Sequence, residues 1–284
     1  MEEVGYRAGD LLRETLEEIG AEQGSALESL LVERVVIGLF FTGVKLSDGT
    51  GGLCFTPIKA IPEAVCCPSS AKAMPVAGKM AGRAALEFVR EMTAGNPLKK
   101  AIGIAVMNAL SMGCWRRRPP QGYRIRRRVD AMEAVHIDAA DYVVVVGALV
   151  PALRELKRRG RPFGVLELDT ATLRPDELPF HIPQERAAEA VARADLLIVT
   201  GTTLINDTLE ELLAARKPGA RVVVMGPTAS GLPEAFFRRG VTAIGGVLVE
   251  EPDRVLDLIA EGGSGYHFFE KGAERIVIEA PAGA

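Results

Sequence analysis

The second half of the chain alternates apolar runs with helical patterns, and this alternation restricts its fold more than any other feature. Residues 196–199, for example, are all apolar, as in a strand that is covered on both faces. The predicted strands are 142–146, 163–168, 195–200, 221–225, 242–249 and 275–279, and the predicted helices are 150–159, 185–193, 207–215, 232–239 and 253–259. The pattern predicts an α/β domain with a mainly parallel sheet and helices on both faces.

A polar turn follows the third predicted strand, in the stretch 195–209 (DLLIVTGTTLINDTL). Its hydroxyl and amide side chains are those of Thr200, Thr202, Thr203 and Asn206. Asp207 and Glu210 have the spacing of a capping box, which predicts that a helix begins there. Such a turn can present backbone N–H groups to an anion, so we expect a ligand site at this position.

Ligands of open parallel sheets bind outside the carboxyl ends of the strands, so the residues that follow each strand are the site candidates. These residues are Gly147, Glu167, Asp169, Thr200, Gly201, Thr202, Thr203, Asn206, Asp207, Gly226, Pro227 and Thr228. Glu167 and Asp207 are the acid/base candidates among them. The alternative is that the glycines and threonines only form turns and helix caps, but loops of this kind carry function disproportionately.

Glu167 lies twenty residues beyond Gly147, which is the separation at which a dinucleotide fold places its ribose-binding acid. However, the sequence after Gly147 lacks G-x-G-x-x-G, so a pyrophosphate would not find the usual close backbone approach. An NAD-type cofactor is therefore disfavoured. An adenosine-like or pterin-like ligand on the same sheet stays open.

The first half of the chain predicts a different fold class. Helical patterns at 6–19 and 26–31 precede a hairpin of residues 35–46 and 53–58, joined by the turn-forming residues 47–52. Asn96, Pro97 and Gly113 have the types expected at the cap, the first turn and the stop of a helix over 97–112. That helix is almost wholly apolar, so Asn108 within it needs partners for its amide.

The length of 284 residues is sufficient for two domains. We expect an α+β domain over 1–115, a basic connection over 116–138 and the α/β domain over 139–284. Asn108 and Lys79 are the site candidates of the first domain, because Asn108 lies on a helix that could face the second domain and Lys79 lies in a glycine-rich approach to a helix.

Composition excludes several classes of partner. The chain has 37 acidic and 34 basic residues, which gives no reason to expect a nucleic-acid partner, and the arginines at 116–118 and 126–128 are interpreted as a solvated connection. The N-terminus lacks the apolar core of a signal peptide and no run has the length of a membrane span, so a cytoplasmic location is expected. Four cysteines without a C-x-x-C and three scattered histidines do not predict a zinc site.

Five segments together resemble the putative heavy-metal chelation domain family. They are GLFFTGVKLSDGTGGLCFTP, MPVAGKMAG, NPLKKAIGIAVMNAL, TGTTLINDTLEELL and MGPTASGLPEAFFRRGVTAIGGVLVEEPD, in this order over nearly the whole chain. The resemblance implies an enolase N-terminal-like domain followed by a Rossmann-like domain, with a site between them. It also implies roles in making or hydrolysing pterin-, flavin- or siderophore-like compounds and in handling heavy metals. The matching positions are 200–207, 226–228 and Gly147, with Asn108 facing them.

Three hypotheses follow for the function. The first is a cytoplasmic enzyme that binds a small anionic or metal-chelating heterocycle between the domains. The second is a noncatalytic metal-binding or metallophore-binding protein, and the third is an S-adenosylmethionine-dependent methyltransferase, which rests on the parallel sheet and Glu167. The sequence identifies no cofactor and no metal, and it leaves open the role of Cys66 and Cys67 and whether the chain forms a homo-oligomer.

Overall fold

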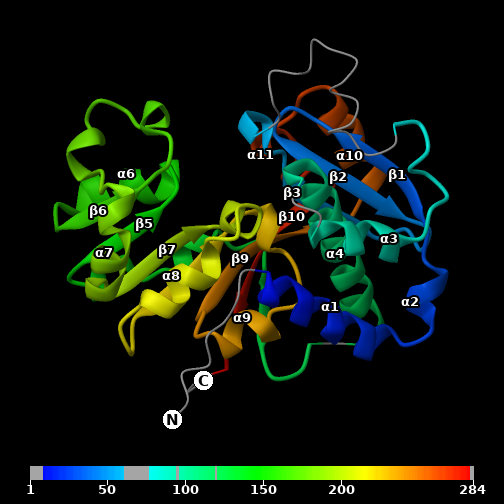
Figure 1. Ribbon diagram of the computed structural model, residues 1–284, viewed down its shortest axis with the longest axis horizontal. Coiled ribbons are helices and arrows are strands. Elements are labelled where there is room, and N and C mark those ends of the chain that lie inside the picture. The colour runs from blue at the N-terminus through cyan, green and yellow to red at the C-terminus, as the bar shows by residue number, and fades with distance from the viewer. Residues whose placement is uncertain (1–8, 61–76, 94–95, 119, 282–284) are drawn as a thin grey trace.

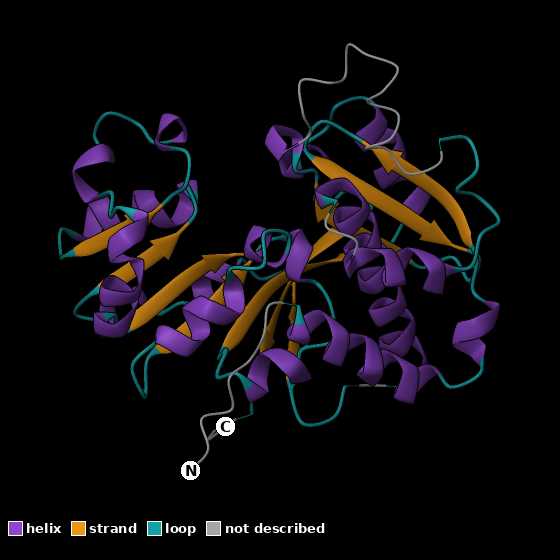
Figure 2. Cartoon of the chain, in the orientation of Figure 1, coloured by secondary structure: helices purple, strands orange, loops and turns teal. Residues whose placement is uncertain are grey.

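The computed structural model describes residues 9–60, 77–93, 96–118 and 120–281. Ten strands of these residues form one curled, mixed sheet, and Figure 2 shows strands across the whole width of the molecule. The strands are β1 (Val32–Ile37), β2 (Phe41–Leu46), β3 (Gly51–Phe55), β4 (Arg124–Arg127), β5 (Val143–Val146), β6 (Phe163–Leu166), β7 (Leu196–Thr200), β8 (Arg221–Met225), β9 (Ala243–Val249) and β10 (Ala273–Glu279).

Helices cover both faces of this sheet (Figure 1). They are α1 (Asp10–Gln23), α2 (Ala26–Ser29), α3 (Ala85–Arg90), α4 (Pro97–Arg117), α5 (Ala131–Ala134), α6 (Val150–Arg159), α7 (Ala187–Arg193), α8 (Leu209–Ala215), α9 (Glu234–Arg238), α10 (Pro252–Ala260) and α11 (Gly265–Phe268). In the described part of the chain, none of them has the length and apolarity that crossing a bilayer needs.

The parallel strands lie in the order β6-β5-β7-β8-β9, as the alternating pattern predicts. The first, second and third of them along the chain are β5, β6 and β7. Their order is therefore 2-1-3-4-5, the flavodoxin type of doubly wound sheet, and not the 3-2-1-4-5-6 order of the dinucleotide fold. Helix α6 packs on one face of these strands, whereas α7, α8 and α9 pack on the other.

Strand β9 connects the two halves of the chain. It pairs with β8 at Ala243–Gly245, with β3 at Val249 and with β10 along its whole length. Because β10 occupies one edge of β9 throughout, β8 and β3 share the other edge. A single apolar core also contains side chains of both halves, such as Leu110 and Val199.

Helix α4 begins where the sequence predicts and ends later. The Asn96 side chain accepts hydrogen bonds from the backbone N–H groups of Leu98 (3.0 Å) and Lys99 (3.1 Å), which caps the helix at Pro97. The predicted stop at Gly113 is wrong, because the helix continues to Arg117. Gly113 instead leaves room for α1, since a Cβ there would lie 3.2 Å from the Gln23 side-chain nitrogen.

The predicted hairpin is a three-stranded meander. The run 35–46 is interrupted after Ile37, so it supplies the second half of β1 and all of β2. Gly51 and Gly52, predicted to lie in the turn, are buried residues of β3. The turn itself is held by Asp48, whose carboxylate accepts the Thr50 N–H at 3.0 Å.

The segment predicted to be a basic connection contains regular structure. The end of α4, strand β4 and helix α5 all lie within 116–138. Strand β4 pairs antiparallel with β10, where Ile125 is opposite Ile278. Helix α5 has a capping box in which Asp130 and Glu133 bond to each other's backbone N–H groups. This segment is therefore one edge of the sheet as well as a connection.

Candidate functional site

A cavity of about 310 Å³ lies at the carboxyl ends of β5, β6 and β7. The chain leaves β5 toward one face of the sheet and leaves β7 toward the other, so a crevice opens between these two neighbouring strands. The lining residues are Val146, Gly147, Leu166, Glu167, Leu168, Ile182, Gln184, Glu185, Ala187, Ala188, Thr200, Thr202, Thr203, Asn206, Thr208, Glu211, Leu212 and Ala215. Its volume is within the range of small-molecule sites.

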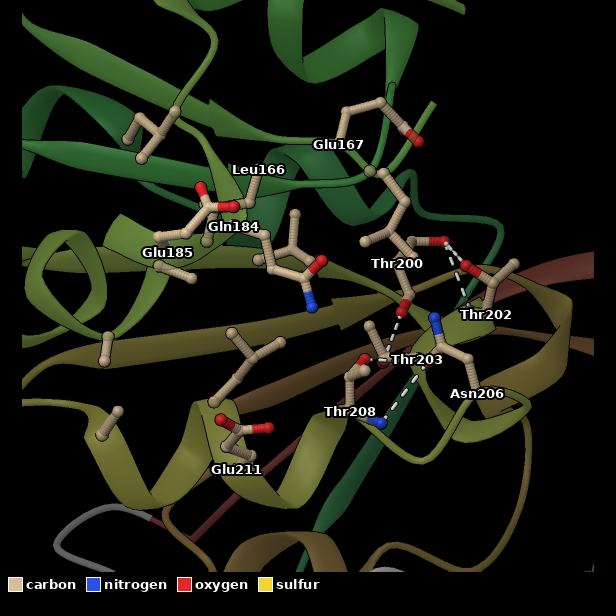
Figure 3. Close-up of a pocket in the computed structure, with 18 residues that line it drawn as sticks. Leu166, Glu167, Gln184, Glu185, Thr200, Thr202, Thr203, Asn206, Thr208 and Glu211 are labelled. Atoms are coloured by element: carbon tan, nitrogen blue, oxygen red, sulfur yellow. Dashed lines mark hydrogen bonds between the residues drawn. The ribbon is translucent and has the colours of Figure 1, made fainter. Parts of the chain in front are cut away.

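The polar turn after β7 forms one wall of this cavity (Figure 3). Thr203 Oγ1 donates to the Thr200 carbonyl at 2.7 Å, and the Thr200 and Thr202 hydroxyls lie 3.1 Å apart. Asn206 Oδ1 accepts from the Thr208 hydroxyl at 2.8 Å. These bonds fix the backbone as a short 3₁₀ helix, Gly201–Leu204, and leave hydroxyl and amide groups facing the cavity.

Gly147 allows β5 to end close to this turn. Its φ is +92°, a conformation that favours glycine, and a Cβ would lie 2.7 Å from Thr200 Cγ2. The predicted neighbours Gly147 and Thr200 therefore lie side by side at the strand ends. A side chain at position 147 would push the turn out of place.

Glu167 also lines the cavity, but backbone groups already hold its carboxylate. Oε2 accepts from the Ala148 N–H at 2.8 Å, and Oε1 accepts from the Asp169 N–H at 3.0 Å. Glu167 thus joins the two loops that follow β5 and β6. Its observed contacts are structural, which weakens the prediction that it acts as an acid or base.

Asp207 does not cap α8, contrary to the prediction. It has a φ of +60°, the helix begins at Leu209, and the Asp207 carboxylate pairs with Lys100 of α4. The carboxylate of Glu210 accepts the backbone N–H groups of Gly9 (2.8 Å) and Leu11 (2.7 Å), at the start of α1. Tertiary partners therefore replace the local capping box. Asp207 lies outside the cavity lining.

A second group of predicted residues lies away from the cavity, where α4 meets the sheet. Asn108 Nδ2 donates to the carbonyls of Leu53 (2.8 Å), Pro227 (3.2 Å) and Thr228 (3.1 Å). Thr228 Oγ1 accepts the Phe55 N–H at 3.0 Å. The Asn108 Nδ2 group thus has hydrogen-bond partners, and they connect α4 with β3 and the loop after β8. Among the described residues, the buried Oδ1 of the same amide has none.

The remaining candidates also lie outside the cavity lining. Gly201 packs against the loop after β8, since a Cβ there would lie 3.1 Å from the Ala229 nitrogen, and Gly226 begins that loop with a φ of +118°. Asp169 pairs with Lys59, and Lys79 is exposed on the surface. The described residues that line the cavity all fall within 146–215, so it lies within the parallel part of the sheet and not between the two predicted domains.

Sequence reasoning missed the side chains at the rim of the cavity. Gln184 and Glu185 come from the long connection after β6, and Glu211 comes from α8. The side chains of Gln184 and Glu211 point into the space between α8 and the strand ends (Figure 3). The helical pattern of 207–215 gives no signal for Glu211, because a charged residue on the polar face of a helix has the pattern of a solvated side chain.

The charge of the cavity differs from what the sequence predicts. Among the described residues that line it, three are glutamates (Glu167, Glu185 and Glu211) and none is basic. The Thr202 N–H, which could have served an anion, already faces the Thr200 hydroxyl at 3.4 Å. An anionic ligand would meet like charges here, so this cavity favours a neutral or cationic ligand.

The described residues contain no group of three or more histidine, cysteine or acidic side chains that could hold a metal ion. Burial raises the pKa of the Cys54 thiol to about 12 and that of the Cys114 thiol to about 11, which opposes formation of the thiolates that metals bind. Cys66 and Cys67 lie outside the described residues.

His181 lies beside the cavity, and its Nε2 is 3.1 Å from the Glu167 carbonyl oxygen.

Two family models match the chain, and both carry the description "putative heavy-metal chelation". One matches residues 21–111 and the other residues 130–278. The chain belongs to the putative heavy-metal chelation family. The family resemblance of the sequence motifs is thereby confirmed.

Relatives of this family share the fold. A crystal structure of a family protein of unknown function from Pyrococcus horikoshii superposes with a TM-score of 0.74 and 19% identity, over 95% of this chain and 100% of that one. A second, from Desulfitobacterium hafniense, gives 0.66 and 18%, over 94% and 98%. An uncharacterized protein of Methanocaldococcus jannaschii is 25% identical over 175 residues, which span 60% of this chain and 62% of the relative's length.

Proposed function

We propose that the chain binds a neutral or cationic heterocycle of the metal-chelating type in the cavity at the ends of β5, β6 and β7. The position of the cavity carries the proposal, since crevices at the strand-order reversal are where doubly wound sheets bind their ligands. An apolar wall for a flat ring is supplied by three alanines and one leucine, which are Ala187, Ala188, Leu212 and Ala215. Thr200, Thr202 and Asn206 supply hydrogen bonds to its edge.

Glu211 determines the charge of the ligand in this proposal. Its side chain faces the cavity, and within the described residues it has no hydrogen bond or ion pair. A carboxylate accepts two N–H donors at once, which matches the edge of an aminopyrimidine ring such as that of a pterin. This geometry supports the pterin-like members of the predicted ligand classes over the siderophore-like ones, which are larger and often anionic.

The metal enters this proposal as part of the ligand. Since the described residues offer no ready-made metal site, a chelating heterocycle would hold the ion through its own donor atoms. The family's metal link is then indirect. A chemical reaction on the heterocycle, by condensation or hydrolysis, would use Glu211 as the acid or base, because Glu167 and Asp207 have other partners.

The two alternative functions have less support. Direct metal binding would have to use residues outside the described ranges, such as Cys66 and Cys67. The methyltransferase hypothesis relied on Glu167 as a ribose ligand, and that carboxylate accepts two backbone N–H groups instead. Mass spectrometry and metal analysis of the untagged full-length protein, beside a variant without cysteines, would separate an organic chelator from direct ligation.

Replacing Glu211 with glutamine is expected to weaken binding of pterin by about tenfold, because a charged hydrogen bond is lost with a cost of about 1.5 kcal/mol. Pterin-6-carboxylate, which carries an extra negative charge, should bind the wild type more weakly than pterin does. Pterin fluorescence in a titration of the full chain measures both.

A matched control is Glu189→Gln on α7, which removes the same charge from a carboxylate that pairs with Arg186 on the surface. It should leave the affinity unchanged. Two results together would show that the cavity is not the pterin site. Glu211→Gln would keep the wild-type affinity for pterin, and it would bind pterin-6-carboxylate no better than the wild type does. A Thr202→Ala/Asn206→Ala variant with full affinity would lead to the same conclusion.

A further inference from the structure

A second groove, of about 520 Å³, lies where the end of α4 meets strands β4 and β9. We call it the arginine groove. It is lined by Met112, Trp115, Arg116, Pro120, Tyr123, Arg124, Ile125, Arg127, Leu248 and Glu250. The arginine-rich segment that the sequence indicated as a solvated connection thus supplies much of its lining.

The floor and one wall of the arginine groove are apolar. Met112 and Leu248 are 6% and 7% exposed, and Ile125 of β4, which also lines the groove, is half-buried. The ring of Trp115 is held in place, because its Nε1 donates to the Tyr123 hydroxyl at 2.7 Å. Tyr123 in turn packs edge-on against Phe237, with ring centroids 6.2 Å apart. A flat ligand would therefore meet a fixed aromatic surface.

The rim of the groove is basic. Arg127 pairs with Glu250 and Glu274, so its charge is compensated. Arg116 of α4 and Arg124 of β4 are exposed, and within the described residues neither side chain has an ion pair or a hydrogen bond. Two guanidinium groups from different elements thus border one groove, and no described residue neutralises their charges through an ion pair.

We propose that the arginine groove binds a small aromatic anion, with its ring on Trp115 and its carboxylate held by Arg116 and Arg124. Guanidinium groups bind carboxylates in a planar, bidentate manner and also stack on rings. This inference is independent of the proposed function. The two cavities have opposite charge, so an anion that the acidic cavity disfavours finds complementary charge here.

Edge protection gives another reason for basic residues on β4. Short, charged edge strands prevent pairing with other chains, and β4 is a four-residue strand of sequence RIRR. That explanation covers Arg124 and Arg126. It does not account for Arg116, which lies on α4, or for an apolar groove of this size between the two arginines.

Trp115 is the sole tryptophan of the chain, so its indole N–H gives one resolved signal in a ¹⁵N-labelled protein. Titration of the full chain with 2-naphthoate is expected to shift this signal in a saturable manner. The neutral analogue 2-naphthamide should bind at least about tenfold more weakly, and acetate, which lacks the ring, should not shift it at the same concentrations.

The Arg116→Ala/Arg124→Ala variant should lose about tenfold or more in affinity for 2-naphthoate. The matched control is Arg117→Ala/Arg154→Ala, which removes two exposed arginines that do not line the groove. It should bind as the wild type does, and circular dichroism checks that both variants fold. The proposal is overturned if 2-naphthoate and 2-naphthamide bind equally, if no shift occurs, or if the control variant loses as much affinity as the groove variant.

Discussion

Replacing Gly52 with alanine is expected to lower the free energy of unfolding by about 3 kcal/mol, because the clash falls on backbone atoms that have no alternative rotamer. Gly52 lies in β3 under helix α4. A Cβ at this position would lie 2.1 Å from the Ala105 carbonyl oxygen and 2.4 Å from the Ala109 nitrogen. The helix could accept the methyl group only by moving away from the sheet, which would open the core around it. Urea unfolding followed by circular dichroism measures the loss.

Gly20→Ala is the matched control for this prediction. Gly20 lies inside α1, and a Cβ there would meet no atom within 4 Å. The substitution should raise the free energy of unfolding, by up to about 1 kcal/mol, since alanine has the higher helix propensity. Opposite signs for two identical substitutions would show that contact with α4 decides the outcome at Gly52. If both variants were as stable as the wild type, the close approach of β3 and α4 would be refuted.

Gly52 also shows where inference from the sequence ended. The run S-D-G-T-G-G has the composition of a turn, and only Gly49 within it has the positive φ, of +76°, that a turn residue uses. Gly51 and Gly52 continue into a strand because a helix fifty residues later packs on them. Local composition does not distinguish a glycine needed for the positive φ of a turn from a glycine needed for the close approach of a second backbone.

Features with a local cause were predicted well. The parallel strands follow from continuous apolar runs, and the start of α4 follows from Asn96 and Pro97. Features that depend on distant partners were not. Asp207 and Glu210 have capping-box spacing, but in the folded chain each carboxylate has a distant partner. Asp207 pairs with Lys100, and Glu210 accepts backbone N–H groups at the start of α1. The enolase-like assignment of the first part and the domain boundaries stay predictions.

In the candidate site, too, features with a local cause were predicted and features that depend on distant partners were not. The rule that ligands bind at strand ends correctly places Gly147 and the polar turn together, because it requires only the order of strands and turns. It does not specify which helix residues face the opening, so Glu211 was missed and the acidic character of the cavity with it. The strand order itself, 2-1-3-4-5, is a matter of tertiary pairing that no single segment encodes.

Replacing Glu14 with glutamine is expected to cost about 3 kcal/mol at pH 7, since it removes the carboxylate that pairs with a buried guanidinium. The Arg239 side chain is fully buried, and its Nη1 and Nη2 donate to the two oxygens of Glu14 at 2.9 and 2.7 Å. The partners lie on α1 and just after α9, so the pair attaches the first helix to the second half of the chain. Urea unfolding at pH 7 measures the cost.

The cost of Glu14→Gln should depend on pH. The hydrogen bond from Arg239 is the main cause that lowers the pKa of Glu14 from its usual 4.5 to about 2. A carboxyl with a lowered pKa contributes its full stability above its unfolded pKa, and the contribution is lost as the pH falls toward the folded value. The difference between wild type and variant should therefore be constant above about pH 5.5 and shrink between pH 4.5 and pH 2. A difference that did not change over this range would contradict the pairing.

A double variant separates the charge from the packing. In Glu14→Met/Arg239→Met both charges are removed and apolar groups of similar length take their place, which in buried pairs is often neutral or stabilising. We expect it to recover most of the stability lost in Glu14→Gln. Recovery would mean that the loss comes from removing the Glu14 carboxylate while the Arg239 charge stays in place. The pair would then determine where α1 docks more than how strongly it is held. Equal instability of the double variant would instead assign the energy to Arg239's own contact with the Ala235 carbonyl, at 2.9 Å, and to the packing around it.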